Sequence, residues 1–259
     1  MTAKQSDASS HWSDSIPDGS KRDFNNRSNL KSRFSKPQFY YSRVLSIRLE
    51  NVMSYTSVRE FTPYDGKDVV LEERLKMAVA IMSKHGSNST LFKVIIGDRA
   101  GDYEIYNWYE TVSAGVKSMT SYSNDPDMQA MQAMRAADPN AEIRGPWVGR
   151  MLHNNTKGDA RMVSVHRDYA VARSDVPKMM YLVPDMQKIT DSLNTELAVG
   201  VPFIAEDHQM MRVVYRFKDL AHWGESVDSL ANNSDFAGLV EKANEIGVLA
   251  RSRVLTKLV

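Results

Sequence analysis

Short segments of alternating apolar and polar residues are separated along this chain by longer segments with helical apolar spacing. Residues 44–49 alternate, with Arg48 on the polar face, which predicts a half-buried strand. Residues 50–68 carry turn chemistry and no clear period, which predicts an irregular connection. Between 70 and 85 the apolar spacing is helical, and Gly86 stands where a C-terminal cap belongs.

The pattern then predicts a hairpin, a helical region and a closing strand, after which the whole order recurs. The predicted elements are strands at 91–96, 103–109 and 143–152 with helix from about 112; then strands at 161–171, 200–205, 210–217 and 248–259, with helices at about 184–197, 220–230 and 235–246. The order strand, helix, strand, strand, helix, strand defines a ferredoxin-like βαββαβ unit. The predicted fold class is therefore α+β, with two ferredoxin-like units in tandem.

A repeat at the level of residues supports the duplication. The segment 103–109 (YEIYNWY) matches 211–217 (MRVVYRF) at an offset of 108, and 124–128 matches 232–236 at the same offset. A sheet with helices on one face leaves its other face bare, and two such faces can cover each other. We expect the two units to form an intrachain α/β barrel around a cavity.

The chain divides into three predicted regions. Residues 1–38 are rich in Ser, Asn, Asp and Lys without an apolar period, which predicts an extended or disordered arm. This basic arm has two interpretations, a docking segment for an acidic partner or neighbouring subunit, and a solvated tail. The first ferredoxin-like unit is predicted at 39–157 and the second at 158–259.

Composition narrows the classes of function. The chain has 259 residues, 42% of them hydrophobic, and 33 basic against 32 acidic residues, so we expect no specific nucleic-acid binding. The absence of cysteine excludes disulfides, thiol catalysis and iron–sulfur clusters. No apolar run reaches membrane-spanning length and the first residues are polar, so a cytoplasmic protein without membrane contact is expected.

Strand alternation predicts which side chains face the cavity, because residues i and i+2 share a face. On 211–217 the less apolar set faces the interior, and the offset of 108 transfers this assignment to the first unit. The same argument applies to 161–171 and 44–49. The predicted interior set is Arg48, Glu104, Tyr106, Trp108, Met162, Ser164, His166, Arg212, Val214 and Arg216.

These residue types suggest a site for a small molecule. His166 could act as a general base, and Arg212 and Arg216 could stabilise an anion, with Arg48, Glu104, Tyr106 and Trp108 as ligand contacts. In the structural alternative, Arg212 pairs with Glu104 as a buried bridge and His166 is an ordinary strand residue. No His-x-x-x-His spacing occurs, so no metal site is expected.

Two segments of the second unit carry a resemblance to a known group. Tyr215-Arg216-Phe217-Lys218-Asp219 and Asn233-Ser234-Asp235-Phe236-Ala237-Gly238-Leu239 form a pattern that resembles the dimeric α/β-barrel superfamily. Its members include antibiotic-biosynthesis monooxygenases, stress-responsive barrel proteins, NIPSNAP-like and EthD-like proteins, and chlorite dismutases. The resemblance covers about 39–259.

Three alternative functions stay open, of which the resemblance implies the first and the third. The first is small-molecule binding or a cofactor-independent oxygenase or isomerase acting on an aromatic or polyketide-like compound, with His166 as base. The second is a non-catalytic interaction protein whose barrel is plugged by Tyr106 and Trp108. The third is a haem protein resembling chlorite dismutases, with His166 as axial ligand. A small-molecule ligand is the expected partner, and assembly into a homo-oligomer stays open.

Overall fold

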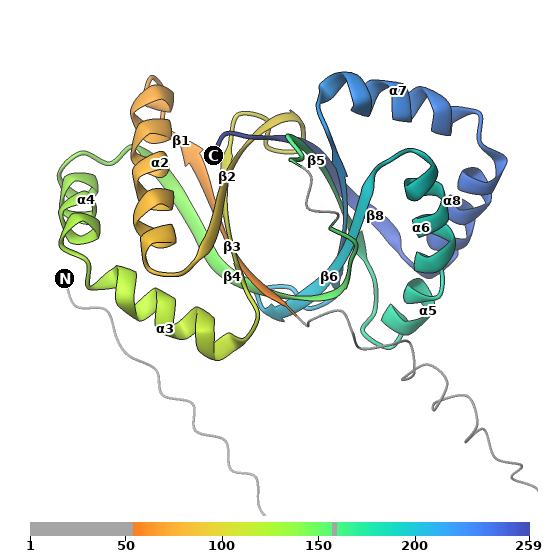
Figure 1. The fold of residues 1–259 in the computed structure, drawn as a ribbon, viewed down its shortest axis with the longest axis horizontal. Helices are drawn as coiled ribbons and strands as arrows, with labels where there is room; N and C mark the ends of the chain where they lie inside the picture. The colour runs from red at the N-terminus through yellow and green to blue at the C-terminus, as the bar shows by residue number, and fades with distance from the viewer. Residues whose placement is uncertain (1–53, 157–159) are drawn as a thin grey trace, which may run out of the picture. The chain divides into compact units, whose positions relative to one another are not determined.

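The computed structural model describes residues 54–156 and 160–259, in which eight strands close into an antiparallel barrel (Figure 1). The order around the barrel is β1-β3-β2-β8-β5-β7-β6-β4. Closure leaves no free sheet edge in this part of the chain, because the last strand of the order pairs with the first.

The first half is one βαββαβ unit, with a pair of helices in its second helical position. Its elements are β1 (Tyr55–Pro63), α2 (Asp68–Lys84), β2 (Asn88–Gly97), β3 (Tyr103–Tyr109), α3 (Val112–Ser123), α4 (Pro126–Ala137) and β4 (Ala141–Asn154). The second half repeats this order with helix pairs in both positions. Its elements are β5 (Val163–Ala170), α5 (Val176–Met180), α6 (Val183–Ser192), β6 (Glu196–Ile204), β7 (Met210–Phe217), α7 (Leu220–Ala231), α8 (Ser234–Ile246) and β8 (Val248–Lys257).

The two halves are related by the offset of 108 that the sequence predicts. Val58 of β1 pairs with Tyr106 of β3, and His166 of β5 pairs with Val214 of β7, so both strand pairs have the same register. The two halves join at two seams, where β2 pairs with β8 and β4 with β6. These seams are equivalent, because β6 is the counterpart of β2 and β8 is the counterpart of β4. The fold class is confirmed, as two ferredoxin-like units form one α/β barrel within a single chain.

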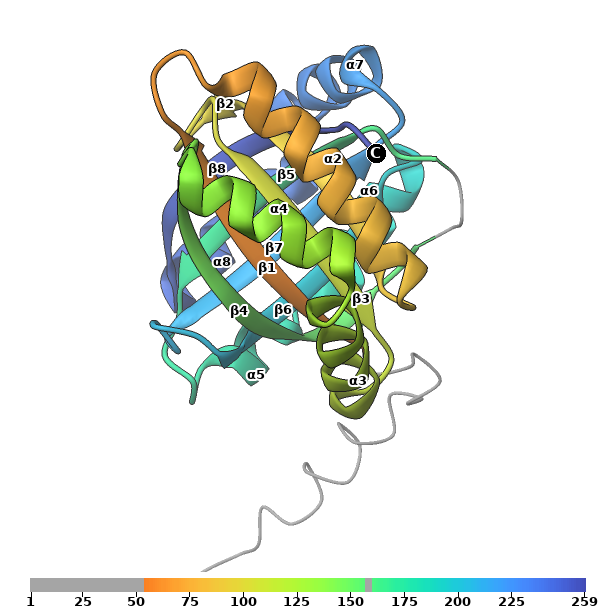
Figure 2. The same cartoon turned by 90° about the vertical axis from the view of Figure 1, so that its left-hand side faces the viewer.

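Helices cover the outside of the barrel and leave its interior to strand side chains. Figure 1 shows α2, α3 and α4 on one side and α5 to α8 on the other, and Figure 2 shows α2 and α4 lying across the first sheet. Leu71 and Leu75 of α2 pack on Tyr103 and Ile105 of β3 in the first helix–sheet core. The second core contains Met179, Val183, Leu197, Val199, Met211 and Val213. The helices therefore use the apolar face of each strand and force its other residues inward.

Several predicted elements differ from the structure. The strand at 44–49, the start of the first unit at 39 and the arm at 1–38 lie outside the described residues. The irregular connection predicted for 50–68 is wrong in its described part, because Tyr55–Pro63 is β1. The helix predicted to reach 197 ends at Ser192, and Leu197 already belongs to β6. The short helix α5 was not predicted.

In the parts of the chain described here, none of the helices combines the length and the apolar character needed to cross a membrane. The turn predicted after β1 is present, with Gly66 at a φ of 74°. The C-terminal cap predicted for α2 is also present, since Gly86 has a φ of 83°.

Candidate functional site

Paired strands place the interior side chains in three successive layers. Each layer takes one residue pair from β1 and β3 and the equivalent pair from β5 and β7. The layers are Thr56, Trp108, Ser164 and Arg216; Val58, Tyr106, His166 and Val214; and Glu60, Glu104, Asp168 and Arg212. The first and third layers carry polar groups in both halves, whereas the middle layer combines one phenol and one imidazole with two valines.

A cavity of about 320 Å³ lies inside the barrel and is lined by all three layers. Its walls include Tyr106, Trp108, His166, Arg212 and Arg216, which were predicted to face it. Small residues of the β4–β6 seam, Gly149 and Gly200, also line it. Gly200 occupies the position equivalent to Phe92 in the first half, since the two pair with Arg212 and Glu104 respectively. The missing side chain leaves space on this side of the barrel.

His166 lies at the centre of the site with its ring almost fully buried, at 4% exposure. Its Nδ1 is 3.2 Å from the phenol oxygen of Tyr106, and the two rings meet edge to face. The same phenol lies 2.7 Å from Glu104 Oε2 and 2.7 Å from Arg212 Nη1. Tyr106 thus connects the imidazole with one acidic and one basic side chain.

The proton positions in this network follow from the donors available. A guanidinium only donates, so Arg212 donates to the phenol oxygen, and the single phenol proton goes to the carboxylate of Glu104. The contact with His166 then requires Nδ1–H to donate to the phenol oxygen. This tautomer leaves the lone pair on Nε2, to which residues 54–156 and 160–259 donate no hydrogen bond.

The electrostatic surroundings keep His166 neutral. Burial, together with the positive charges of Arg212 and Arg253, lowers its pKa well below the ordinary value of 6.5. Burial also raises the pKa of Tyr106, so the phenol keeps its proton. A neutral imidazole with a lone pair can accept a proton from a ligand, whereas an imidazolium cannot.

Arg212 is fixed by a bidentate bond to Asp168 on the neighbouring strand. Nε and Nη2 lie 2.6 and 2.8 Å from the two carboxylate oxygens, and Arg251 of β8 also donates to Asp168. Burial alone would raise the pKa of Asp168, but the two guanidinium groups overcome this effect and lower it. Arg212 therefore orients Tyr106 and has little freedom to move toward a ligand.

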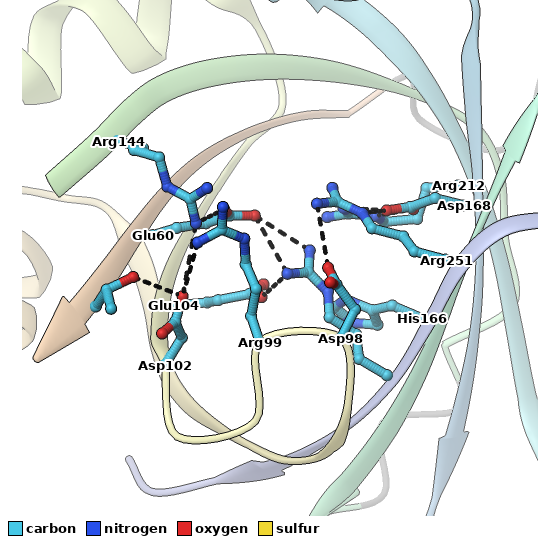
Figure 3. A network of polar contacts seen from close by, with 12 residues as sticks. Glu60, Asp98, Arg99, Asp102, Glu104, Arg144, His166, Asp168, Arg212 and Arg251 are labelled. Carbon is cyan, nitrogen blue, oxygen red and sulfur yellow. Dashed lines mark hydrogen bonds and ion pairs between the residues drawn. The ribbon is translucent and has the colours of Figure 1, made fainter. Parts of the chain in front are cut away.

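A second ion network lies across the barrel from this pair (Figure 3). Arg253 of β8 is 1% exposed and lies 2.6 Å from Glu104 and 3.2 Å from Glu60. Arg144 of β4 lies 2.6 Å from Glu60. The structural alternative of a bridge between Arg212 and Glu104 is therefore wrong in its partners, because Arg212 pairs with Asp168 and Glu104 with Arg253.

Arg216 lies in the layer that contains Trp108, with its guanidinium 5.4 Å from the indole centroid. Its Nη1 donates to Asn154 and Thr156, each at 3.2 Å, and is 3.7 Å from Glu196. Burial lowers the pKa of Arg216, and Glu196 only partly opposes this effect. A ligand anion next to Arg216 would compensate for the lost hydration.

The sequence prediction placed most interior residues correctly. Tyr106, Trp108, Ser164, His166, Arg212, Val214 and Arg216 line the cavity, and Glu104 lies behind Tyr106 in the third layer. The prediction that Met162 faces the interior is wrong, because this residue precedes β5 and is 43% exposed. Arg48 lies outside the described residues.

Five charged residues of the site were missed: Glu60, Arg144, Asp168, Arg251 and Arg253. Asp168 follows His166 by two residues on the same strand face, so alternation alone would have found it. Glu60 was missed because β1 was taken for a connection, although it precedes Asp168 by the offset of 108. The three arginines belong to β4 and β8, the last strand of each half. The pairing of these strands is interrupted by bulges, where the simple alternation of faces fails.

Among residues 54–156 and 160–259, no group of three or more histidine and carboxylate side chains is arranged to hold a metal ion. The acidic residues of the interior are instead bound to arginines.

Comparison with known proteins supports the fold. No protein-family model and no curated protein matches the chain. Among solved structures, a provisionally named monooxygenase from Fusobacterium nucleatum superposes with a TM-score of 0.55 at 10% identity, covering 80% of this chain and 93% of its own. A similarly named protein from Lactobacillus acidophilus gives 0.54 at 12% identity, with 79% and 94% covered.

An anthrone oxidase-like protein superposes with a TM-score of 0.57 at 9% identity, covering 81% of this chain and 93% of its own. A provisionally named chlorite dismutase gives 0.52 at 11% identity, with 80% and 95% covered. At this identity the likeness concerns the fold alone. It agrees with the resemblance that the second unit carries in its sequence.

Proposed function

We propose that this chain, which has the fold of the dimeric α/β-barrel superfamily with both sheets in one polypeptide, binds a compact aromatic molecule in its cavity. We further propose that it acts there as a cofactor-independent oxygenase or isomerase. His166 is the general base, and Arg216 holds the anion that forms when the substrate loses a proton.

One observation carries this proposal: a buried, neutral imidazole at the cavity wall whose Nδ1 is already engaged. Tyr106 fixes the ring through Nδ1, and burial with Arg212 and Arg253 nearby keeps Nε2 unprotonated. A base in this state accepts a proton only from a group placed against Nε2. The engaged Nδ1 and the position of the ring at the cavity wall support a role in proton transfer to Nε2 rather than a purely structural one.

The cavity suits an aromatic substrate with one acidic position. The rings of Tyr106 and Trp108 are nearly parallel, 6.3 Å apart, and offer flat apolar surfaces. Arg216 supplies positive charge next to Trp108. After deprotonation, an electron-rich aromatic anion can react directly with O₂, one oxygen atom ending in a product carbonyl and the other in water. If the anion instead took the proton back at another carbon, the reaction would be an isomerisation.

The names of two groups of structural neighbours agree with this chemistry. The anthrone oxidase-like protein and the monooxygenases share the fold, so a barrel of this kind is compatible with oxidation of small molecules. The low identity transfers no residue role to this chain. The proposal rests on the residues of the cavity.

Haem fits this cavity poorly. At about 320 Å³ the cavity lies near the lower end of the range of ligand pockets, roughly 300–1,000 Å³, which favours a compact ligand over an iron porphyrin with its propionates. No reaction step is therefore assigned to haem. The alternative of a plugged barrel is also disfavoured, because Tyr106 and Trp108 line the cavity without filling it.

The experiment compares substitutions that separate the two nitrogens of His166. Oxygen uptake with 1,8-dihydroxyanthrone, an aromatic compound with an acidic methylene group, is measured in buffer containing a chelator. In His166→Asn the amide can still donate to Tyr106 from the position of Nδ1, but no base remains. We expect its kcat to fall by at least about a hundredfold, the contribution typical of a general base.

Arg216→Gln removes the positive charge next to Trp108 and should raise KM and lower kcat. The matched control is His208→Gln, an exposed histidine at the hairpin between β6 and β7. Turnover in His166→Asn equal to that of the wild type, with the fold intact by circular dichroism, would refute the proposed base. Absence of uptake and of binding across a panel of anthrones and hydroquinones would refute the substrate class.

A further inference from the structure

Three helix ends of the first half meet outside the barrel and bring a serine, a histidine and an aspartate into line. His85 is the C-cap of α2, Ser121 lies in the last turn of α3, and Asp125 is the N-cap of α4. His85 Nδ1 is 2.7 Å from Ser121 Oγ, and His85 Nε2 is 2.6 Å from Asp125 Oδ2. None of the three residues lines the central cavity.

The hydrogen bonds in this cluster have a defined direction. Asp125 accepts from His85, from Lys84 at 3.0 Å and from the backbone N–H of Asp127, and these donors hold its pKa below the ordinary value. A carboxylate cannot donate, so the proton between His85 and Asp125 belongs to Nε2. A neutral His85 then presents a lone pair at Nδ1, and the hydroxyl of Ser121 donates to it.

This is the arrangement that activates a serine nucleophile: a hydroxyl bonded to a base, and the base oriented by a third group. The exposure of the three residues also suits a reactive serine. Ser121 is exposed and the side chain of His85 is 20% exposed, whereas that of Asp125 is only 3% exposed. A reagent from solution can therefore reach the hydroxyl, while the orienting carboxylate is shielded from water.

The internal repeat shows that helix capping does not require this cluster. At the offset of 108, the equivalents of His85, Ser121 and Asp125 are Leu193, Ser229 and Asn233. Leu193 is the C-cap of α6, and Asn233 caps α8 by accepting from Phe236 N–H. Ser229 bonds the backbone oxygen of Glu225 instead. The second half thus makes the same turns without an imidazole or a carboxylate at the three equivalent positions, and the nearby His222 bonds the backbone oxygen of Leu193 rather than a serine.

We propose that Ser121, His85 and Asp125 form a second reactive site, in which Ser121 is a nucleophile toward small activated acyl and phosphonyl esters. Ser121 Oγ attacks the carbonyl carbon of an ester and its proton passes to His85 Nδ1. The bond to the leaving oxygen breaks, and that oxygen takes the proton from His85. Water then cleaves the acyl-serine by the reverse route, so that ester and water give acid and alcohol.

The test uses the full chain and an alkyl fluorophosphonate, which transfers a phosphonyl group to activated serines and releases fluoride. Peptide mass spectrometry follows the adduct on Ser121 and on Ser229 in the same molecule. We expect Ser121 to react at least about tenfold faster than Ser229, because only Ser121 has a base at hydrogen-bond distance.

Two of the variants, His85→Leu and Asp125→Asn, introduce the residues that the second half has at the equivalent positions. His85→Leu and Asp125→Asn should each reduce the rate at Ser121 to that of Ser229, Ser121→Ala should abolish the adduct, and Ser229→Ala should leave it unchanged. Hydrolysis of p-nitrophenyl acetate should follow the same order. Equal labelling of the two serines in the wild type, or an unchanged rate at Ser121 in a folded His85→Leu protein, would overturn the proposal.

Discussion

The phenol of Tyr106 and the imidazole of His166 come from different halves of a duplicated chain and meet inside the barrel, 3.2 Å apart. The position equivalent to His166 in the first half holds Val58, and the position equivalent to Tyr106 in the second half holds Val214. A barrel of two identical chains would repeat every interior residue. Here the two halves have diverged, so the middle layer of the cavity holds one phenol and one imidazole instead of two copies of each.

Tyr106 should act through His166, and Tyr106→Phe tests this role. The substitution removes the acceptor of Nδ1–H and leaves Arg212 Nη1 without its phenol partner. We expect a loss of about 1–3 kcal/mol in the free energy of unfolding. We also expect a fall in kcat that exceeds any change in KM.

Urea denaturation and steady-state oxygen uptake measure the two effects of Tyr106→Phe. Tyr181→Phe is the control, since Tyr181 is 58% exposed on the surface. An unchanged kcat in Tyr106→Phe would mean that the phenol does not orient the base.

The lowered pKa of His166 makes the stability of the fold depend on pH. In the unfolded chain a histidine takes up a proton below about pH 6.5, while His166 in the barrel stays neutral. The unfolded state then binds more protons, so the free energy of unfolding falls as the pH falls below about 6.5. One such group contributes at most about 1.4 kcal/mol per pH unit.

Denaturation curves between about pH 7 and pH 5 should therefore have a smaller pH slope for His166→Asn than for the wild type. The comparison of slopes removes the contributions of the other histidines and any constant loss of stability. Identical slopes would show that His166 has the same pKa in both states.

Arg253 should be essential for the fold because it neutralises two buried carboxylates. Arg253→Met keeps much of the side-chain volume but leaves Glu104 without this ion pair and Glu60 with Arg144 only. Removing one partner of a buried pair costs about 3–5 kcal/mol. Urea denaturation should show this loss. The control is Arg135→Met at an exposed position of α4, whose free energy of unfolding should stay within about 0.5 kcal/mol of the wild type.

Gly200 should set the size of the accepted ligand. A Cβ at this position would lie 3.2 Å from the sulfur of Met151, a flexible side chain that can give way. Gly200→Ala should therefore fold but narrow the cavity, raising KM for a fused-ring substrate with little change in kcat. Gly224→Ala is the control, since no atom lies within 4 Å of a Cβ there. A lower KM in Gly200→Ala would show that ligands do not use this wall.

The sequence predicts the barrel because the duplicated strands keep one register. The outer face of β7 is apolar and that of β3 is mostly so, with Asn107 as the exception, so alternation separates Tyr103 and Met211 from the interior. Pattern reasoning fails at β1, where Thr56 and Glu60 point inward and Ser57 and Arg59 alternate with them. A strand with polar residues on both faces has no hydrophobic period, although it is buried by its neighbours.

The charged part of the site was not predictable from hydrophobicity for a related reason. Glu60, Asp168 and Arg253 are buried at 1–3% exposure, but in sequence they resemble solvent-facing residues. Only their mutual pairing stabilises them inside, and that pairing joins strands far apart in the chain. Glu60 and Arg253, for example, are separated by 193 residues.

The protonation state of His166, a neutral ring with its proton on Nδ1, can be tested without knowledge of a substrate. Long-range ¹H–¹⁵N correlation spectra of the full chain report both ring nitrogens, and the signals of His166 are those lost in His166→Asn. We predict a protonated Nδ1, an unprotonated Nε2 and no titration near the ordinary pKa of 6.5. Two protonated nitrogens at neutral pH, or a midpoint near 6.5, would contradict it.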